Sequence, residues 1–129
     1  YHIDYIIDLT ESHELLHNPF KNNINIINFP IKDCKAPSTK DLSKIINVIL
    51  NLKGLIYIAC KGGHTRSGIV AACLLGKINN LSSNKALCIV GEEWKSQRDM
   101  SYLSAKIKRL GSPQSIVQKK IVKKFLITE

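Results

Sequence analysis

Hydrophobic residues follow two patterns along this chain, short β-rich runs and longer runs at helical spacing. The β-rich runs, in which branched and aromatic residues predominate, cover residues 5–9, 24–29 and 55–59. Runs with an apolar residue at every third or fourth position cover residues 38–52, 68–77, 86–90, 94–110 and 113–125. Because strands come early and alternate with helices before helices dominate, we expect an α/β fold with a central, mostly parallel twisted sheet flanked by helices.

Polar residues and glycines predict where the helices begin and end. Ser38, with Asp41 three residues later, resembles a capping box, and Gly54 is placed to end the same helix near its C-cap. Ser112 and Pro113 fit the N-cap and N1 positions of the last helix. The apolar side of that helix is expected to comprise Ile116, Val117, Ile121, Val122 and Phe125.

Length and composition favour one ordinary globular domain over residues 1–129. The chain has 129 residues, of which 44% are hydrophobic, and no run approaches the roughly 18 apolar residues of a membrane span. The four cysteines show no C-x-x-C spacing and no basic-then-apolar leader opens the chain, which favours reduced thiols and a cytoplasmic or nuclear location. Because the histidines do not cluster with the cysteines at ligand spacing, we expect no metal site. Cys73 and Cys88 are expected to be packed within helices, and Trp94 in the core.

The formal net charge of +9 favours anionic partners, and nearly all of the positive charge comes from lysine. Four lysines of the last helix, at positions 119, 120, 123 and 124, form a polar stripe. A solvated helix face is the default interpretation of such a stripe. An acidic protein, a lipid headgroup and RNA are the alternatives.

One stretch, Cys60-Lys61-Gly62-Gly63-His64-Thr65-Arg66-Ser67-Gly68, carries the candidate chemistry. It lies between an apolar strand and an apolar helix, so its backbone N–H groups can converge on an anion in front of the helix N-terminus. Arg66 adds a planar fork that grips two phosphate oxygens, which lysine could not reproduce. Cationic neighbours and a helix N-terminus lower the pKa of a cysteine from its usual value of about 8.5. A thiolate at Cys60 would thus face an oxyanion site, with the Ser67 hydroxyl beside it.

This stretch resembles the C-x5-R-[S/T] signature of the cysteine-dependent protein tyrosine and dual-specificity phosphatases. The resemblance implies that Cys60 is the nucleophile, that Arg66 binds the phosphate, and that Ser67 donates a hydrogen bond to the departing sulfur. It places a general acid upstream, where Asp33 follows Phe29-Pro30-Ile31-Lys32 and lies 27 residues before Cys60. Asp41 is the nearest rival, but capping explains it. The phosphate loop would comprise Lys61, Gly62, Gly63, His64, Thr65 and Arg66, and no metal or cofactor is implied.

Three further features bear on the resemblance. Ser112-Pro113-Gln114, followed by Gln118, is similar to the tail of compact, atypical dual-specificity phosphatases. A glutamine positions the hydrolytic water in related enzymes, so Gln114 and Gln118 are candidates for that role, with surface residues of a helix N-terminus as the alternative. Ala59 stands where most members of the superfamily have histidine. Cys34 lies beside the proposed acid, and some relatives form a disulfide between a second cysteine and the nucleophile.

We therefore expect metal-independent hydrolysis of phosphate monoesters through a phosphocysteine, with a phosphorylated protein as the substrate. The small size of the chain favours broad specificity over a deep pocket for phosphotyrosine alone. One alternative keeps the chemistry and changes the substrate to a phosphoinositide or an RNA 5′ phosphate. Another is a catalytically weak phosphate-binding module, in which Ala59 marks lost catalysis. A rhodanese-type sulfurtransferase gives no reason for Arg66-Ser67 or for an upstream acid.

Overall fold

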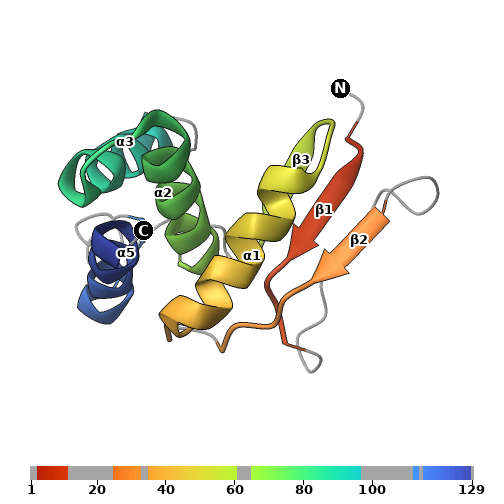
Figure 1. The fold of residues 1–129 in the computed structure, drawn as a ribbon, viewed down its shortest axis with the longest axis horizontal. Coiled ribbons are helices and arrows are strands. Elements are labelled where there is room, and N and C mark those ends of the chain that lie inside the picture. Colours follow the sequence, from red (N-terminus) through yellow and green to blue (C-terminus); the bar gives the residue numbers. More distant parts are fainter. Residues whose placement is uncertain are drawn as a thin grey trace.

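The computed structural model describes residues 3–11, 25–32, 35–60, 65–96, 112–113 and 115–128, and every structural statement below concerns these residues. Strands come first, alternate with helices and give way to helices, as the sequence predicts (Figure 1). In chain order the elements are β1 (Tyr5–Asp8), β2 (Asn25–Asn28), α1 (Thr39–Asn51), β3 (Ile56–Ala59), α2 (Arg66–Asn79), α3 (Ser83–Ser96) and α5 (Ile116–Thr128).

The three described strands form a parallel sheet in the order β2-β1-β3, with β1 in the centre. Tyr5 lies opposite both Asn25 and Ile56, and the register continues without a break to Asp8. The carboxyl ends of the three strands therefore meet at one edge of the sheet. The α/β class and the parallel sheet expected from the sequence are confirmed.

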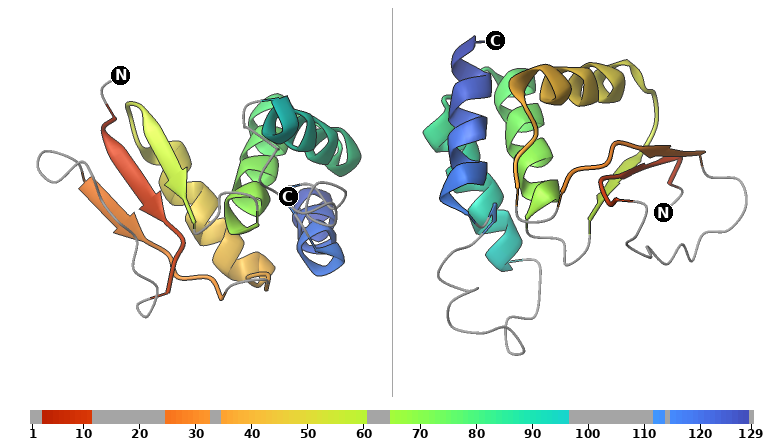
Figure 2. Two further views of the ribbon diagram at one scale, coloured as in Figure 1. Left: turned by 180° about the vertical axis from the view of Figure 1, so that it is seen from behind. Right: turned by 90° about the horizontal axis from the view of Figure 1, so that it is seen from below.

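The described helices lie on one side of the sheet and beyond the β3 edge (Figures 1 and 2). Helix α1 runs along the strands and covers β3, α2 lies next to α1, and α3 and α5 lie on the far side of α2. Their apolar faces and one face of the sheet enclose a continuous hydrophobic core. Its most deeply buried apolar residues are Ile7, Leu9, Leu42, Ile46, Ile69, Val70, Ala72, Cys73, Val122 and Phe125.

Helix α1 begins where the sequence predicts. The Ser38 hydroxyl accepts a hydrogen bond from the Asp41 backbone N–H at 3.1 Å, which satisfies one of the donors that a helix N-terminus leaves unpaired. The apolar positions at helical spacing point into the core. The C-cap is Leu52, and Gly54 lies two residues further on with φ +125°. That left-handed conformation suits glycine, and the Asp4 side chain fills the space a Cβ would need.

The predicted start of the last helix is wrong. Helix α5 begins at Ile116, and its cap is Ser115 rather than Ser112. The Ser115 hydroxyl accepts from the Gln118 backbone N–H at 3.1 Å, while the Gln118 side-chain oxygen accepts from the Ser115 N–H at 3.3 Å. This reciprocal pair is a capping box of the S-x-x-Q type, and it fixes the start of the helix better than the Ser112-Pro113 pair.

The predicted apolar face of this helix is also wrong in part. Ile116 is 71% exposed and Val117 59% exposed. The buried face instead runs through Gln118, Val122 and Phe125, which recur at helical spacing. A polar residue, Gln118, thus occupies the core position that the hydrophobic pattern assigned to its apolar neighbours.

Three other expectations concern the middle of the chain. Trp94 is buried as predicted, but it belongs to α3 and does not begin a separate helix, and residues 97–111 lie outside the described part. Cys73 is fully buried in α2, where desolvation raises its pKa to about 12, whereas Cys88 is exposed, contrary to the prediction.

No described helix combines the length and apolar character needed to cross a membrane.

Candidate active site

The edge where the strands end brings together the two segments that lead to the candidate catalytic residues Cys60 and Asp33. The Leu9 N–H donates to the Ala59 carbonyl at 2.9 Å, and the Leu9 carbonyl accepts from the Ile31 N–H at 3.0 Å. Leu9, the first residue after β1, is therefore hydrogen-bonded both to the residue before Cys60 and to Ile31, which precedes Asp33 by two residues. The parallel register makes this possible, because the residues that follow the three strands all lie at the same edge of the sheet.

The sulfur of Cys60 lies at the N-terminus of α2. The backbone N–H of Ser67 donates to the Cys60 Sγ at 3.4 Å, and the Ser67 Oγ lies 3.3 Å from the same sulfur. The N-cap residue of α2, Thr65, makes no side-chain capping hydrogen bond. The sulfur thus takes the place of a side-chain cap, and the partial positive charge of the helix N-terminus favours a negative charge on it.

Arg66, the first residue of α2, is fully buried. Its Nη1 donates to the Ile31 backbone carbonyl at 3.0 Å, which fixes the orientation of the planar guanidinium. Electrostatic interactions are stronger at such a buried position than in water. Arg66 is therefore both a candidate phosphate ligand and a second link, after Leu9, between the Cys60 loop and the segment before Asp33.

Of the predicted site residues that the structure describes, four lie together, and the fifth, Gln118, lies in α5. Cys60, Thr65, Arg66 and Ser67 are adjacent at the start of α2, and each is buried or half-buried. Seven further candidates lie outside the described residues: Asp33, Cys34, Lys61, Gly62, Gly63, His64 and Gln114.

Gln118 is buried, not a surface residue of the helix N-terminus. Its side-chain Nε2 donates to the Lys35 backbone carbonyl at 3.2 Å. The same side chain closes the capping box with Ser115. The Gln118 amide is therefore bound on both sides by backbone groups.

Three polar residues that the sequence analysis did not single out shape the end of β1. The Asp8 Oδ1 accepts from the Thr10 N–H at 2.9 Å and from the Thr10 hydroxyl at 2.6 Å. The Asn28 Nδ2 donates to the backbone carbonyls of Asp8 at 2.9 Å and Thr10 at 3.0 Å. These bonds hold the chain around Leu9. The signal in the sequence is an aspartate that ends an apolar strand with threonine two residues later, the pattern of an Asx turn.

The Ser112-Pro113 segment packs directly against the start of α2. A Cβ placed on Gly68 would meet the Ser112 Oγ and would lie 3.0 Å from the Pro113 nitrogen. Only glycine allows this approach of two backbones. The Ser112-Pro113 segment therefore supports the helix that carries Arg66 and Ser67.

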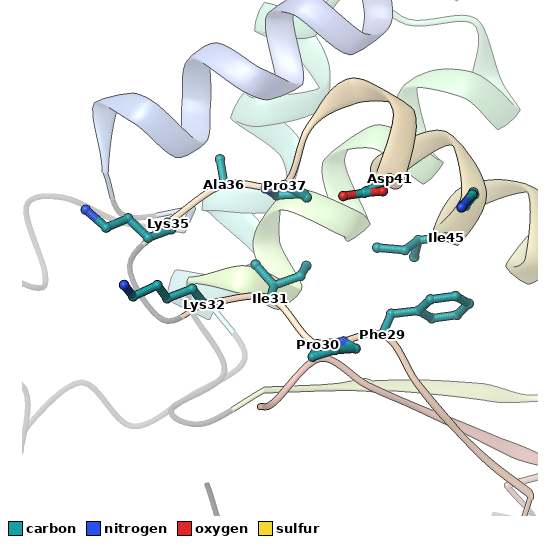
Figure 3. Close-up of a pocket in the computed structure, with 10 residues that line it drawn as sticks. Phe29, Pro30, Ile31, Lys32, Lys35, Ala36, Pro37, Asp41 and Ile45 are labelled. Carbon is teal, nitrogen blue, oxygen red and sulfur yellow. The ribbon is translucent and has the colours of Figure 1, made fainter. Parts of the chain in front are cut away.

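A pocket of about 330 Å³ adjoins the segments on both sides of Asp33 (Figure 3). Apolar residues of the segment after β2 and of α1 form its walls, while lysines and Asp41 supply the charge. Its lining residues are Phe29, Pro30, Ile31, Lys32, Lys35, Ala36, Pro37, Asp41, Lys44 and Ile45.

Comparison with known families assigns the chain. The family described as "Swiss Army Knife protein, DSP-PTPase phosphatase domain" matches residues 1–122. The chain therefore belongs to this family of dual-specificity-type phosphatase domains, as the C-x5-R-S stretch predicts.

Two viral proteins assigned as tyrosine phosphatases are among its relatives. Protein 197R of Invertebrate iridescent virus 6 is 36% identical over 94 residues, which cover 66% of this chain and 35% of that protein. Protein 067L of Invertebrate iridescent virus 3 is 36% identical over 135 residues, covering 96% of this chain and 54% of that protein. The chain thus spans about a third and about half of the length of these relatives.

Solved structures share the fold. The active form of Tk-PTP superposes with a TM-score of 0.71 at 26% identity, covering 98% of this chain and 80% of that chain. PTPMT1 in complex with PI(5)P gives a TM-score of 0.70 at 17% identity, covering 98% of this chain and 78% of that chain. At that identity the second likeness concerns the fold alone.

Proposed function

We propose that this chain is a cysteine-dependent protein tyrosine and dual-specificity phosphatase, in which residues 1–129 act as one catalytic domain. The observation that carries the proposal is the position of the Cys60 sulfur, at the N-terminus of α2 and within hydrogen-bond distance of the Ser67 amide. The fully buried Arg66 beside it supplies the second requirement, a fixed guanidinium for the phosphate.

In the first step, the Cys60 thiolate attacks phosphorus in line with the leaving oxygen. The S–P bond forms as the P–O bond breaks, and Asp33 gives its proton to the leaving alkoxide or phenoxide. Arg66 and the backbone N–H groups of residues 61–66 hold the equatorial oxygens as charge develops on them. No metal ion takes part in this scheme.

In the second step, water attacks the phosphocysteine and loses its proton to the Asp33 carboxylate. The S–P bond breaks, and its electron pair returns to sulfur. The Ser67 amide donates to the sulfur, and the Ser67 hydroxyl, whose oxygen lies 3.3 Å from the sulfur, turns to donate as well when this negative charge appears. Gln114 is a candidate for positioning the attacking water, as the resemblance implies.

A phosphorylated protein is the substrate that we favour. The viral relatives are assigned as tyrosine phosphatases, which supports phosphotyrosine, and the net charge of +9 suits acidic phosphopeptides. A phosphoinositide is the second candidate, with which the fold shared with PTPMT1 in complex with PI(5)P is consistent. Rates on phosphotyrosine and phosphoserine peptides, phosphoinositide and 5′-triphosphorylated RNA, compared under one condition, separate these substrates.

The proposal is tested by the Cys60→Ser variant with p-nitrophenyl phosphate as substrate. We expect hydrolysis to fall at least a thousandfold in Cys60→Ser, because a serine hydroxyl is not ionised near neutral pH and cannot replace the thiolate. Cys88→Ala, which removes an exposed thiol, is the matched control and should keep its activity. Wild-type hydrolysis should be inhibited by vanadate and unaffected by EDTA. Equal activity of Cys60→Ser and the wild type would overturn the proposal. Absence of activity in the wild type as well as in the variants would overturn it in favour of a phosphate-binding module.

A further inference from the structure

We infer that Gln118 is a positioning residue for the general acid, acting through the backbone next to Asp33. This inference rests on the proposed function, because it assumes that Asp33 donates the proton. It differs from the water-positioning role implied for Gln118 by the family resemblance. The side-chain amide of Gln118 is committed to backbone groups of Lys35 and Ser115.

The first observation is the long-range hydrogen bond from Gln118 to the acid segment. The Gln118 Nε2 donates to the Lys35 carbonyl at 3.2 Å across 83 residues of sequence, and the Gln118 side chain is fully buried. This bond costs free energy to break, since the fully buried Gln118 amide would lose its acceptor without gaining water in its place. Helix α5 therefore holds the chain two residues after Asp33.

The second observation is that the other flank of Asp33 is also held. The Arg66 Nη1 donates to the Ile31 carbonyl at 3.0 Å, two residues before Asp33. The Lys35 N–H donates to the Lys32 carbonyl at 3.1 Å, which fixes the two flanks relative to each other. In Figure 3 the side chains of Lys32 and Lys35 both extend away from the pocket in the same direction.

The chemistry gives this arrangement a consequence for the rate. Proton transfer to the leaving oxygen requires the acid to lie within about 2.6–3.2 Å of it. A displacement of about 1 Å can cost about a hundredfold in rate. Arg66 holds the flank before Asp33 and also belongs to the phosphate loop. The position of the flank after Asp33, at Lys35, can be fixed independently of that loop by a distant element. Among the described residues, the Gln118 side chain of α5 makes this contact.

The two halves of the Gln118 side chain allow its roles to be separated. Gln118→Glu keeps an oxygen that can accept from the Ser115 N–H, so the capping box survives. When its carboxyl is ionised, it replaces the donor to Lys35 with a second acceptor, so the bond to the acid segment is lost. Ser115→Ala does the reverse: it removes the hydroxyl that caps α5 and leaves the Gln118 side chain in place.

The experiment measures kcat/KM for a series of aryl phosphates whose leaving groups range from p-nitrophenolate to the phenolate of tyrosine, whose pKa is about 10. A well-placed acid makes the rate nearly independent of the leaving group. We expect Gln118→Glu to lose about twofold on p-nitrophenyl phosphate and at least tenfold on the most basic leaving group. Ser115→Ala and Asp41→Asn should keep the wild-type slope. Asp33→Asn should show a steep dependence of kcat/KM on the pKa of the leaving group. The double variant with both Asp33→Asn and Gln118→Glu should show nearly the same dependence.

Several outcomes would overturn the inference. An equal loss on all esters, or the same loss in Ser115→Ala, would mean that Gln118 acts only on the stability of the fold. A burst of phenol with an unchanged slope would assign Gln118 to the hydrolytic step instead. If Asp33→Asn is steep and Gln118→Glu is not, only the inference about Gln118 fails. If Asp33→Asn keeps the wild-type slope, the acid of the proposed function is wrong, and the inference fails with it.

Discussion

The sulfur of Cys60 has two partners in a single residue, the backbone N–H and the hydroxyl of Ser67. The amide belongs to the helix and is always present, whereas the hydroxyl can be removed by mutation. Ala59, which replaces the histidine usual in the superfamily, supports the loop through its backbone carbonyl, which accepts from Leu9. That support does not depend on the side chain at position 59.

Ser67→Ala should slow the second step more than the first. A hydrogen bond to a charged group contributes about 1.5–3 kcal/mol, so losing it from the departing thiolate should lower kcat about 10- to 100-fold. The rate of phosphocysteine formation, and hence kcat/KM, should change much less. Stopped-flow measurement of p-nitrophenol release should then show a burst followed by a slow steady state.

Ser96→Ala is the control for this prediction, because it removes an exposed serine hydroxyl that bonds within α3. It should behave like the wild type. A parallel decrease of kcat and kcat/KM in Ser67→Ala, without a burst, would show that the hydroxyl acts before the phosphocysteine forms.

Helix α2 connects the site to the rest of the fold. Its first turn carries Arg66 and Ser67, and Gly68 in the same turn packs against Ser112 and Pro113. About two helical turns after Gly68, a Cβ on Gly76 would meet the Leu126 side chain of α5. Two glycines thus let α2 lie close to the C-terminal part of the chain.

Gly68→Ala and Gly91→Ala form a matched pair that tests this packing. Both glycines are helical and both face Ser112, but a Cβ on Gly91 has its nearest neighbour at an ordinary distance of 3.8 Å. Gly68→Ala should lower the free energy of unfolding by about 1–3 kcal/mol through overpacking. Gly91→Ala should raise it by about 0.5–1 kcal/mol through helix propensity. Urea denaturation measures both, and an equal effect of the two substitutions would contradict the packing argument.

Sequence periodicity predicted the elements well where the buried face is purely apolar. Helix α1 and the three strands follow from their hydrophobic pattern and the Ser38 cap. The pattern failed at α5, because the residue that starts its buried face is Gln118. A polar residue is buried there because its hydrogen bonds are satisfied by Ser115 and Lys35. The spacing of hydrophobic residues carries no information about these bonds.

At the scale of the whole molecule, the parallel sheet assembles the site. At the edge where the three strands end, the backbone of Leu9 is hydrogen-bonded to Ala59 on one side and to Ile31 on the other, and Cys60 follows Ala59 directly. The C-x5-R-S motif identified the Cys60 loop from local sequence alone. The bonds from Arg66 to Ile31 and from Gln118 to Lys35 could not be predicted, because they join residues 35 and 83 positions apart.

The central claim is that the Cys60 sulfur attacks phosphorus, and trapping the covalent intermediate tests it most directly. Protein turning over p-nitrophenyl phosphate is quenched in acid, digested and analysed by mass spectrometry, with and without EDTA. We predict a phosphoryl group on the peptide that contains Cys60, unaffected by EDTA and more abundant in Ser67→Ala. Phosphate found on another residue such as His64, or no phosphorylated peptide in an active sample, would contradict the account.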